Sequence, residues 1–491
     1  MIGDVSWQVF FCLLVGIVLG GRTYRKKVEA SCDRELGIRE RYAPAFPLYW
    51  VSMFFVWFSC GMIYGVISGE YLPMIMELMP VIFCVVIYFA LLLSILPLLR
   101  RWFSAGACAI VWMIPMGMLY YSTNDLDLPV FVIHIPFGVS EQVLRVVFWI
   151  WLTGFVAVLG WNIVSHIRFR RWLLKDARPI TFGPVLEALR KEEQFANIQG
   201  EPYPLWISDR VRTPLSIGLF RKTICVVLPK KDYPQEDLSL IFRHELVHIG
   251  CKDSIAKFFI AFCTAMFWFF PLMWVAVRRF ADDLELSCDE TVLADCEDAV
   301  RRRYAALLLD TAADQRGFTT CLATSAGGLR YRLKNVMAPR KRLVGGVMVG
   351  VVTFLLMMLC FCICFSFDPG TAAERIFPDA DPSRYELGGV LWEDGSSMGG
   401  DRDAVMGYLM ELEVAQLSEE YSLMDQPEMI QMYIYGQEEN YTLFLTQRYM
   451  RVDTFTKTGS TERCYYLSTP LDRAYLLSLM AVEERHGVDA S

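Results

Sequence analysis

Long apolar runs separated by charged segments dominate the first third of the chain. A run needs roughly 20 apolar residues to cross a bilayer as a helix. Six runs approach this length: 5–20, 48–68, 79–99, 103–121, 144–165 and 343–366. The pattern predicts an α-helical multi-pass membrane protein. Residues 1–165 would form an N-terminal membrane domain of about five transmembrane helices, and residues 343–366 would form the last transmembrane helix.

A seventh apolar run, "IAKFFIAFCTAMFWFFPLMWVAV", covers residues 255–277. Pro271 lies near its middle, and a proline inside a helix breaks or kinks it. We therefore expect a hydrophobic hairpin that associates with the membrane by dipping into it, lying on it or packing against the other helices. A seventh crossing is the alternative, because the run is long enough for one.

Basic segments indicate how the chain is oriented, because loops rich in lysine and arginine stay on the cytoplasmic side. The loop 21–47, the segment "HIRFRRWLLKDAR" after the fifth run and "RYRLKNVMAPRKR" before the last run are all basic. Six crossings put these segments inside and both termini outside. The aqueous parts are then a cytoplasmic region over 166–342 and an extracytoplasmic region over 367–491.

The outer region alternates short aromatic segments with turns. The segments "MIQMYIYG", "NYTLFLTQ", "YMRVDTFT" and "RCYYLST" predict an antiparallel meander, and apolar spacing predicts helices over 401–415 and 470–484. Cys464 is the only cysteine after residue 367, so no disulfide joins this region. We expect a small α/β, sensor-like domain that binds an unknown extracytoplasmic ligand or partner. A simple spacer is the alternative.

Composition agrees with a membrane protein that has aqueous parts. The mean hydropathy is +0.34, and 54% of the residues are hydrophobic, which is too apolar for an ordinary soluble domain. Charged residues still make up 21% of the chain. The net charge of −7 disfavours direct nucleic acid binding.

The segment "LSLIFRHELVH" carries the clearest candidate chemistry. On a helix, His244 and His248 lie one turn apart on one face, which suits two corners of a tetrahedral zinc site. Glu245 stands next to the first of them and is placed to act as general base. Upstream, Asp232 and Gln235 predict a capping box at the start of this helix. A pair of ordinary surface or core histidines is the alternative.

A third zinc ligand is expected to be a carboxylate. The remaining histidines fall outside the cytoplasmic region or at its membrane boundary: His134, His166 and His486. The segment "FADDLELSCDE" offers Glu285, and a site of two histidines and a glutamate is a known catalytic zinc arrangement. Asp289, four residues later, would share a face with Glu285 and steady a ligating histidine. If 255–277 crossed the membrane, Glu285 could not meet His244.

The stretch "FRHELVHIGCKDSIAKFFIAFCTAMFWFFPLMWVAVRRFADDLELSCDE" resembles the BlaR/MecR-type membrane metallopeptidases, which are gluzincins. The segment Thr213–Pro229 also resembles the edge-strand region of that family. The resemblance implies a cytoplasmic zinc-protease domain, mostly α with a small edge sheet. It implies one zinc ion per chain, bound by His244, His248 and Glu285, with Glu245 as catalytic base in peptide hydrolysis.

The same resemblance implies a signal-transducing receptor in the cell membrane. A ligand outside would activate the cytosolic protease, which cleaves itself and inactivates a transcriptional repressor of the BlaI/MecI type. By position, "CLATSAGGLRYRLKN" resembles the self-processing region, with cleavage expected near Ser325. No Ser-x-x-Lys occurs after residue 367, so the penicillin-binding sensor domain is missing and β-lactam sensing is not implied.

Three other functions fit parts of the pattern. The first is a metalloprotease for membrane-protein processing or quality control. The second is a catalytically inactive receptor scaffold, which the presence of every catalytic residue type disfavours. The third is a transporter with an accidental motif, although the apolar runs show neither paired half-repeats nor the buried charges that transporters carry.

Overall fold

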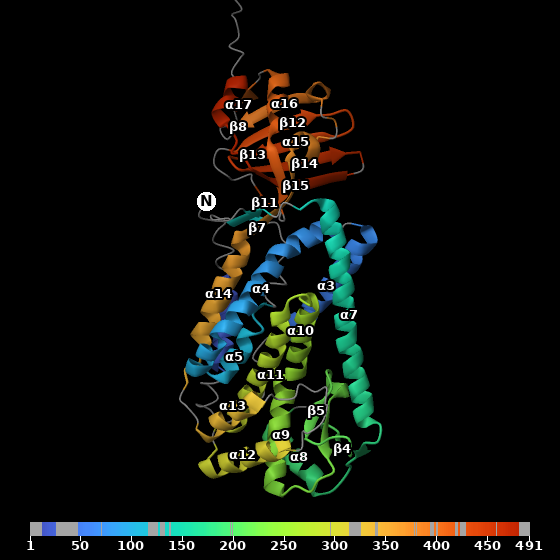
Figure 1. Cartoon of the computed structure of the whole chain (residues 1–491), viewed down its shortest axis with the longest axis vertical. Helices are drawn as coiled ribbons and strands as arrows, with labels where there is room; N and C mark the ends of the chain where they lie inside the picture. The colour runs from blue at the N-terminus through green and yellow to red at the C-terminus, as the bar shows by residue number, and fades with distance from the viewer. Residues whose placement is uncertain are drawn as a thin grey trace, which may run out of the picture.

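A computed structural model shows an elongated molecule, with a β-rich domain at one end, a mixed helical and sheet region at the other, and long apolar helices between them (Figure 1). The structure describes residues 12–25, 48–69, 71–115, 126–127, 133–136, 139–196, 198, 200–294, 296–313, 326–338, 342–377, 379, 381–392, 397–398, 401–417, 421–422, 429–457 and 459–480.

Apolar helices form the middle of the molecule. They are a helix over residues 12–25 together with α3 (Leu48–Ser68), α4 (Tyr71–Trp102), α7 (Glu141–Leu174) and α14 (Gly346–Cys362). Among the described residues, two helical segments are long and apolar enough to cross a membrane, Val81–Trp102 and Gln142–Leu174. The expectation of a membrane protein is consistent with these two helices.

Several element bounds differ from those the sequence predicts. The helix expected over 144–165 is α7, which continues through the basic residues to Leu174. In the run 103–121, residues 103–115 are described, and there the short α5 (Ala105–Val111) is followed by a turn over 112–114. Proline disfavours helical backbone in the residue before it, and Pro115 follows α5 closely.

Small residues bring the first described helix against α14. A Cβ atom on Gly20 would lie 2.5 Å from the carbonyl oxygen of Gly346, and one on Gly16 would lie 2.7 Å from that of Gly350. Each helix therefore presents two glycines four residues apart, which lets two helices in a membrane approach closely. The helix that leads to the outer domain is thus packed directly on the N-terminal helix.

The apolar run 255–277 folds back on itself. It forms α10 (Asp253–Met266) and the first part of α11 (Pro271–Val292), and the break falls at Pro271 as the sequence predicts. The tip packs on α7, where Trp151 Nε1 donates to the carbonyl oxygen of Met266 over 2.8 Å. Trp268 Nε1 donates in turn to the carbonyl oxygen of Trp151 over 3.2 Å. These two hydrogen bonds hold the tip of the hairpin against α7.

A small sheet and several helices surround this hairpin base. The sheet has the order β3-β4-β6-β5, and β5 lies at one edge. Its strands and neighbouring helices are β3 (Arg178–Pro179), β4 (Leu205–Ser208), β5 (Leu215–Ile217), β6 (Cys225–Pro229), α8 (Pro184–Phe195), the 3-10 turn η1 (Arg221–Thr223), α9 (Gln235–Cys251), α12 (Asp298–Ala313) and α13 (Ala326–Met337). A mostly helical domain with a small sheet agrees with the expected architecture.

The start of α9 differs from the expected capping box. The helix begins at Gln235, its N-cap is Pro234, and no side chain caps it. Asp232 lies too early in the chain to serve as that cap. Pro234 holds an extended backbone with ψ at 148°, so the helix starts directly after it. The capping prediction for Asp232 is therefore wrong.

The outer domain is built on a nine-stranded sheet of order β2-β7-β10-β15-β14-β13-β12-β8-β9. Its elements are β2 (Ile133–Pro136), β7 (Ile363–Thr371), α15 (Ala372–Arg375), the 3-10 turn η2 (Pro382–Arg384), β8 (Glu386–Trp392), β9 (Ser397–Met398), α16 (Arg402–Glu411), β10 (Glu413–Leu417), β12 (Ile430–Tyr435), β13 (Asn440–Leu445), β14 (Tyr449–Thr456), β15 (Gly459–Leu467) and α17 (Arg473–Met480). The last four strands pair in sequence as an antiparallel meander, which confirms that prediction.

The helices of the outer domain pack on the sheet through one apolar core. Val405 and Leu409 of α16 and Leu476 of α17 are buried with strand residues such as Met432 and Leu443. The helix expected over 401–415 ends earlier, because the backbone turns extended at its C-cap and continues as β10. Residues 481–484 of the second expected helix lie outside the described residues.

Two apolar helices, α7 and α14, connect directly to this sheet. The chain passes from α14 into β7 without a linker. The segment before α7 contributes β2, which pairs in parallel with β7, and β1 (Leu126–Asp127), which pairs with β11 (Tyr421–Ser422). Helices α7 and α14 are therefore joined to each other at their outer ends through the sheet.

Candidate metal centre

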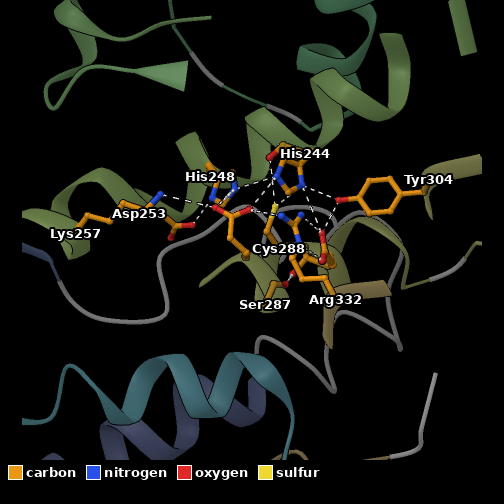
Figure 2. A network of polar contacts seen from close by, with 11 residues as sticks. His244, His248, Asp253, Lys257, Ser287, Cys288, Tyr304 and Arg332 are labelled. Atoms are coloured by element: carbon orange, nitrogen blue, oxygen red, sulfur yellow. Dashed lines mark hydrogen bonds and ion pairs between the residues drawn. The ribbon is translucent and has the colours of Figure 1, made fainter. Parts of the chain in front are cut away.

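Two histidines of α9 lie close together on the side of that helix that faces α11 (Figure 2). His244 and His248 are one helical turn apart, and their Nε2 atoms are 3.1 Å from each other. The helix buries Phe242 and Leu246 in the surrounding apolar core, which fixes its rotation. The face that carries the two imidazoles is therefore held toward α11.

Glu285 of α11 brings its carboxylate close to both imidazoles. Its Oε2 lies 3.5 Å from His244 Nε2, and its Oε1 lies 3.6 Å from His248 Nε2. Burial would raise the pKa of the Glu285 carboxyl, but His248 and Arg332 outweigh burial and hold that pKa well below its usual value. The carboxylate is therefore ionised and faces both imidazoles.

The spacing of these donor atoms fits a tetrahedral zinc site. Zinc bonds to histidine nitrogen and carboxylate oxygen are about 2.0–2.1 Å long, which makes the edge of the coordination tetrahedron about 3.4 Å. The two Nε2 atoms are 3.1 Å apart, and they lie 3.5 and 3.6 Å from different oxygens of Glu285, all close to that edge. An ion bound among them would take one Nε2 atom from each histidine and one or both oxygens of Glu285.

A tight turn after α9 places a carboxylate against the Nδ1 side of the His248 ring. α9 ends in Lys252, whose φ of 56° is in the left-handed region, and α10 begins at the next residue. The reversal brings Asp253 Oδ2 within 2.6 Å of His248 Nδ1. A carboxylate in this position holds the proton on Nδ1. The Nε2 atom of His248 is then the one available to a metal, and it lies 3.1 Å from His244 Nε2 and 3.6 Å from Glu285 Oε1.

His244 is oriented by a tyrosine and an aspartate. Tyr304 of α12 donates its hydroxyl proton to Asp289 Oδ1 over 2.6 Å, so the tyrosine oxygen can accept the Nδ1 proton of His244 over 2.8 Å. Asp289 itself lies 3.9 Å from His244 Nδ1. The sequence anticipated a link from Asp289 to a histidine, and the structure places Tyr304 between them.

The surroundings of the two imidazoles favour a positive charge at this position. Burial would lower the pKa of His244, but its contacts with Cys288 and Glu285 raise that pKa to about 10. The surroundings therefore stabilise positive charge at His244. A divalent metal supplies that charge while using both lone pairs, so the residues fit zinc.

Cys288 provides a sulfur close to the same group. Its Sγ, His244 and His248 offer ligand atoms within 4.8 Å of one another. The sulfur contacts His244 at Nδ1 over 3.2 Å and at the carbonyl oxygen over 3.4 Å. Glu285 instead faces the Nε2 atoms of both histidines, so the geometry favours Glu285 over Cys288 as the third donor.

The remaining expected residues are placed as follows. Glu245 is buried on α9 beside His244. Ser325 lies outside the described residues, although α13 begins at the next position. Four residues that the sequence analysis did not identify take part in the centre: Asp253, Cys288, Tyr304 and Arg332. The first two are near the motifs in sequence, whereas the others come from helices without a recognisable signal.

Comparison with known proteins points to a metallopeptidase. Residues 131–336 match the family model described as BlaR1 peptidase M56. Over 195 residues the chain is 21% identical to "Regulatory protein BlaR1" of Bacillus licheniformis. The alignment covers 39% of this chain and 32% of that protein, so about a third of the relative's length is spanned.

Residues 131–336 are therefore similar to the BlaR/MecR-type family, in agreement with the sequence resemblance. The match implies a metallopeptidase, and together with the two long apolar helices it suggests a membrane protein. The matched residues end before the outer domain, and its nine-stranded sheet lies almost wholly outside the match.

Proposed function

We propose that this protein is a multi-pass membrane receptor whose cytoplasmic zinc endopeptidase is controlled by its outer domain. A ligand or partner bound outside would activate proteolysis inside. The protease would then cleave its own chain and inactivate a transcriptional repressor, possible substrates being those of the BlaI/MecI type. Both termini would be extracytoplasmic.

The observation that carries the proposal is the convergence of His244 Nε2, His248 Nε2 and the Glu285 carboxylate, with separations of 3.1–3.6 Å. Two imidazole Nε2 atoms close to each other and to a carboxylate are typical of a metal site rather than of a pair of ordinary buried histidines. Behind each imidazole stands a partner that fixes which nitrogen carries the proton. Such support is typical of metal sites.

The chemistry follows from the residues of α9. Zinc, when bound, lowers the pKa of a coordinated water and polarises the scissile carbonyl. Glu245, buried beside His244, would take the proton of the attacking water on its carboxylate and pass it to the leaving amine. Asp253 and Tyr304 would hold the histidine rings in place throughout.

An open strand edge supports a peptide as substrate. β5 (Leu215–Ile217) is an edge strand and packs beside α9. An extended peptide can pair with such an edge through main-chain hydrogen bonds. This arrangement would align a peptide bond with the helix that carries Glu245.

The connections of the outer sheet support a receptor. The outer domain and the peptidase region lie at opposite ends of the long helices (Figure 1). Helix α14 runs into β7, and β2 joins the start of α7 to the same sheet. A change in the outer domain would therefore act on two membrane helices at once. Self-cleavage is proposed near Ser325, and N-terminal sequencing of fragments tests that position.

Metal removal tests the proposed activity. The full-length protein, purified in detergent, should cut its own chain or an unfolded protein such as casein. Treatment with a chelator should abolish the cutting, and one equivalent of zinc should restore it. Mass spectrometry of the fragments gives the rates. Cleavage that continues after the metal is removed would contradict the proposal.

A further inference from the structure

Arg332 is the charged residue that joins α13 to the metal centre. Its side chain is 8% exposed, and Figure 2 shows it beneath the histidines. The guanidinium bonds to both oxygens of Asp289, with Nε to Oδ2 at 2.7 Å and Nη2 to Oδ1 at 2.8 Å. Its third nitrogen, Nη1, lies 3.1 Å from Glu285 Oε2. All three nitrogens are therefore engaged by two carboxylates of one helix.

The two carboxylates need this cation. Glu285 and Asp289 are one turn apart on α11, and like charges at that spacing repel each other. Asp289 is buried, where an unpaired charge is costly. A planar guanidinium matches a carboxylate with two parallel bonds, which an ammonium group does not. Arginine at this position therefore neutralises both carboxylates and fixes their orientation.

The contacts of Arg332 form part of a closed ring of interactions. The Glu285 oxygen that faces Arg332 is the one 3.5 Å from His244 Nε2. Asp289 Oδ1, which accepts from Arg332 Nη2, also accepts from the Tyr304 hydroxyl. The Tyr304 oxygen is in turn 2.8 Å from His244 Nδ1. Arg332 thus links two of the three donor residues, one directly and the other through Asp289 and Tyr304.

We propose that Arg332 is a positioning residue of the metal centre, which holds Glu285 and His244 in the geometry that binds zinc. The inference rests on the proposed zinc peptidase and adds α13 to the machinery that sets metal affinity. Arg332 does not touch the substrate. Its action is to fix the carboxylate of Glu285 and, through Asp289, the proton arrangement behind His244.

A second arginine provides a matched control. The Arg342 side chain is 7% exposed, and it forms an ion pair with Glu290, the residue next to Asp289, over 2.8 Å. It also donates to Asn335 of α13 over 2.6 Å. Arg342 therefore ties α13 to α11 from an equally buried position, but none of its contacts reaches a proposed zinc ligand. Loss of either arginine should weaken the packing of α13 on α11. Only loss of Arg332 should also remove the contacts with Glu285 and Asp289.

The test measures zinc affinity by chelator competition in the full-length protein in detergent. Removing a residue that orients metal ligands typically costs 10- to 100-fold in metal affinity. Arg332→Met should therefore bind zinc about 10- to 100-fold more weakly than the wild type. Arg342→Met should stay within about 3-fold of the wild type, well below that loss. With Co²⁺ in place of zinc, only the Arg332 variant should change the visible spectrum, which reports ligand geometry.

The outcomes separate this inference from the function on which it rests. If Arg332→Met does not fold, zinc affinity is measured in Arg332→Lys instead. This variant keeps the positive charge but not the paired bonds to Asp289, so its zinc affinity should still fall. Equal zinc affinity in the wild type and the Arg332 variants would overturn the inference and leave the peptidase proposal standing. An equal loss in Arg342→Met would show that helix docking alone matters. A wild type that binds no zinc would overturn both proposals.

Discussion

Glu245→Gln is expected to stop proteolysis while leaving zinc in place. The side chain is buried beside His244 and would carry the proton from water to the leaving amine, whereas an amide cannot accept it. General acid–base groups typically contribute 10²- to 10⁴-fold to a rate, so cleavage should fall by at least about 10²-fold. Fragment formation in zinc-loaded protein gives the rate, and metal analysis gives the zinc content.

A second glutamate on the same helix serves as the control. Glu236 lies in the first turn of α9, is largely exposed and pairs with Arg303. Glu236→Gln makes the same chemical change far from the histidines along the helix, and it should cleave at the wild-type rate. Comparable activity in the Glu245 and Glu236 variants would remove Glu245 from the mechanism.

Asp283→Ala is expected to destabilise the folded protein by about 3–5 kcal/mol, because removing one partner of a buried ion pair strands the other. Asp283 of α11 is fully buried. It accepts from Arg100 Nε over 2.6 Å and from Trp112 Nε1 over 2.8 Å. The same helix faces the metal centre with Glu285 on another side. Denaturation in detergent, followed by tryptophan fluorescence, gives the free energy of unfolding.

Two controls sharpen this result. Replacing both partners, as in Arg100→Leu with Asp283→Leu, leaves no unpaired charge and should recover much of the lost stability. Asp310→Ala breaks the half-exposed pair with Lys231 and should change stability by less than about 1 kcal/mol. A loss below about 1 kcal/mol for Asp283→Ala would mean that this contact does not hold α11 to the membrane helices.

Local periodicity explains what the sequence could predict. The spacing of His244 and His248 defines a helix face by itself, and Pro271 marks the hairpin break by backbone chemistry alone. The outer meander was recognisable because each strand pairs with its neighbour in sequence. These features depend on residues that are close together in the chain.

Features that depend on distant residues could not be predicted in the same way. Tyr304 and Arg332 reach the centre from two further helices, and nothing in their local sequence marks that destination. The pairing of β2 with β7 joins segments more than two hundred residues apart. Even the nearby Asp253 depends on the left-handed backbone of Lys252, which a lysine rarely adopts.

The metal content of the purified protein tests the central claim most directly. Zinc per chain should be measured by inductively coupled plasma mass spectrometry for the wild type and for His248→Ala. We expect one zinc ion per wild-type chain and almost none in the variant, because the variant lacks a donor of the proposed site. A wild type without zinc, or a variant that retains a full equivalent, would contradict the account.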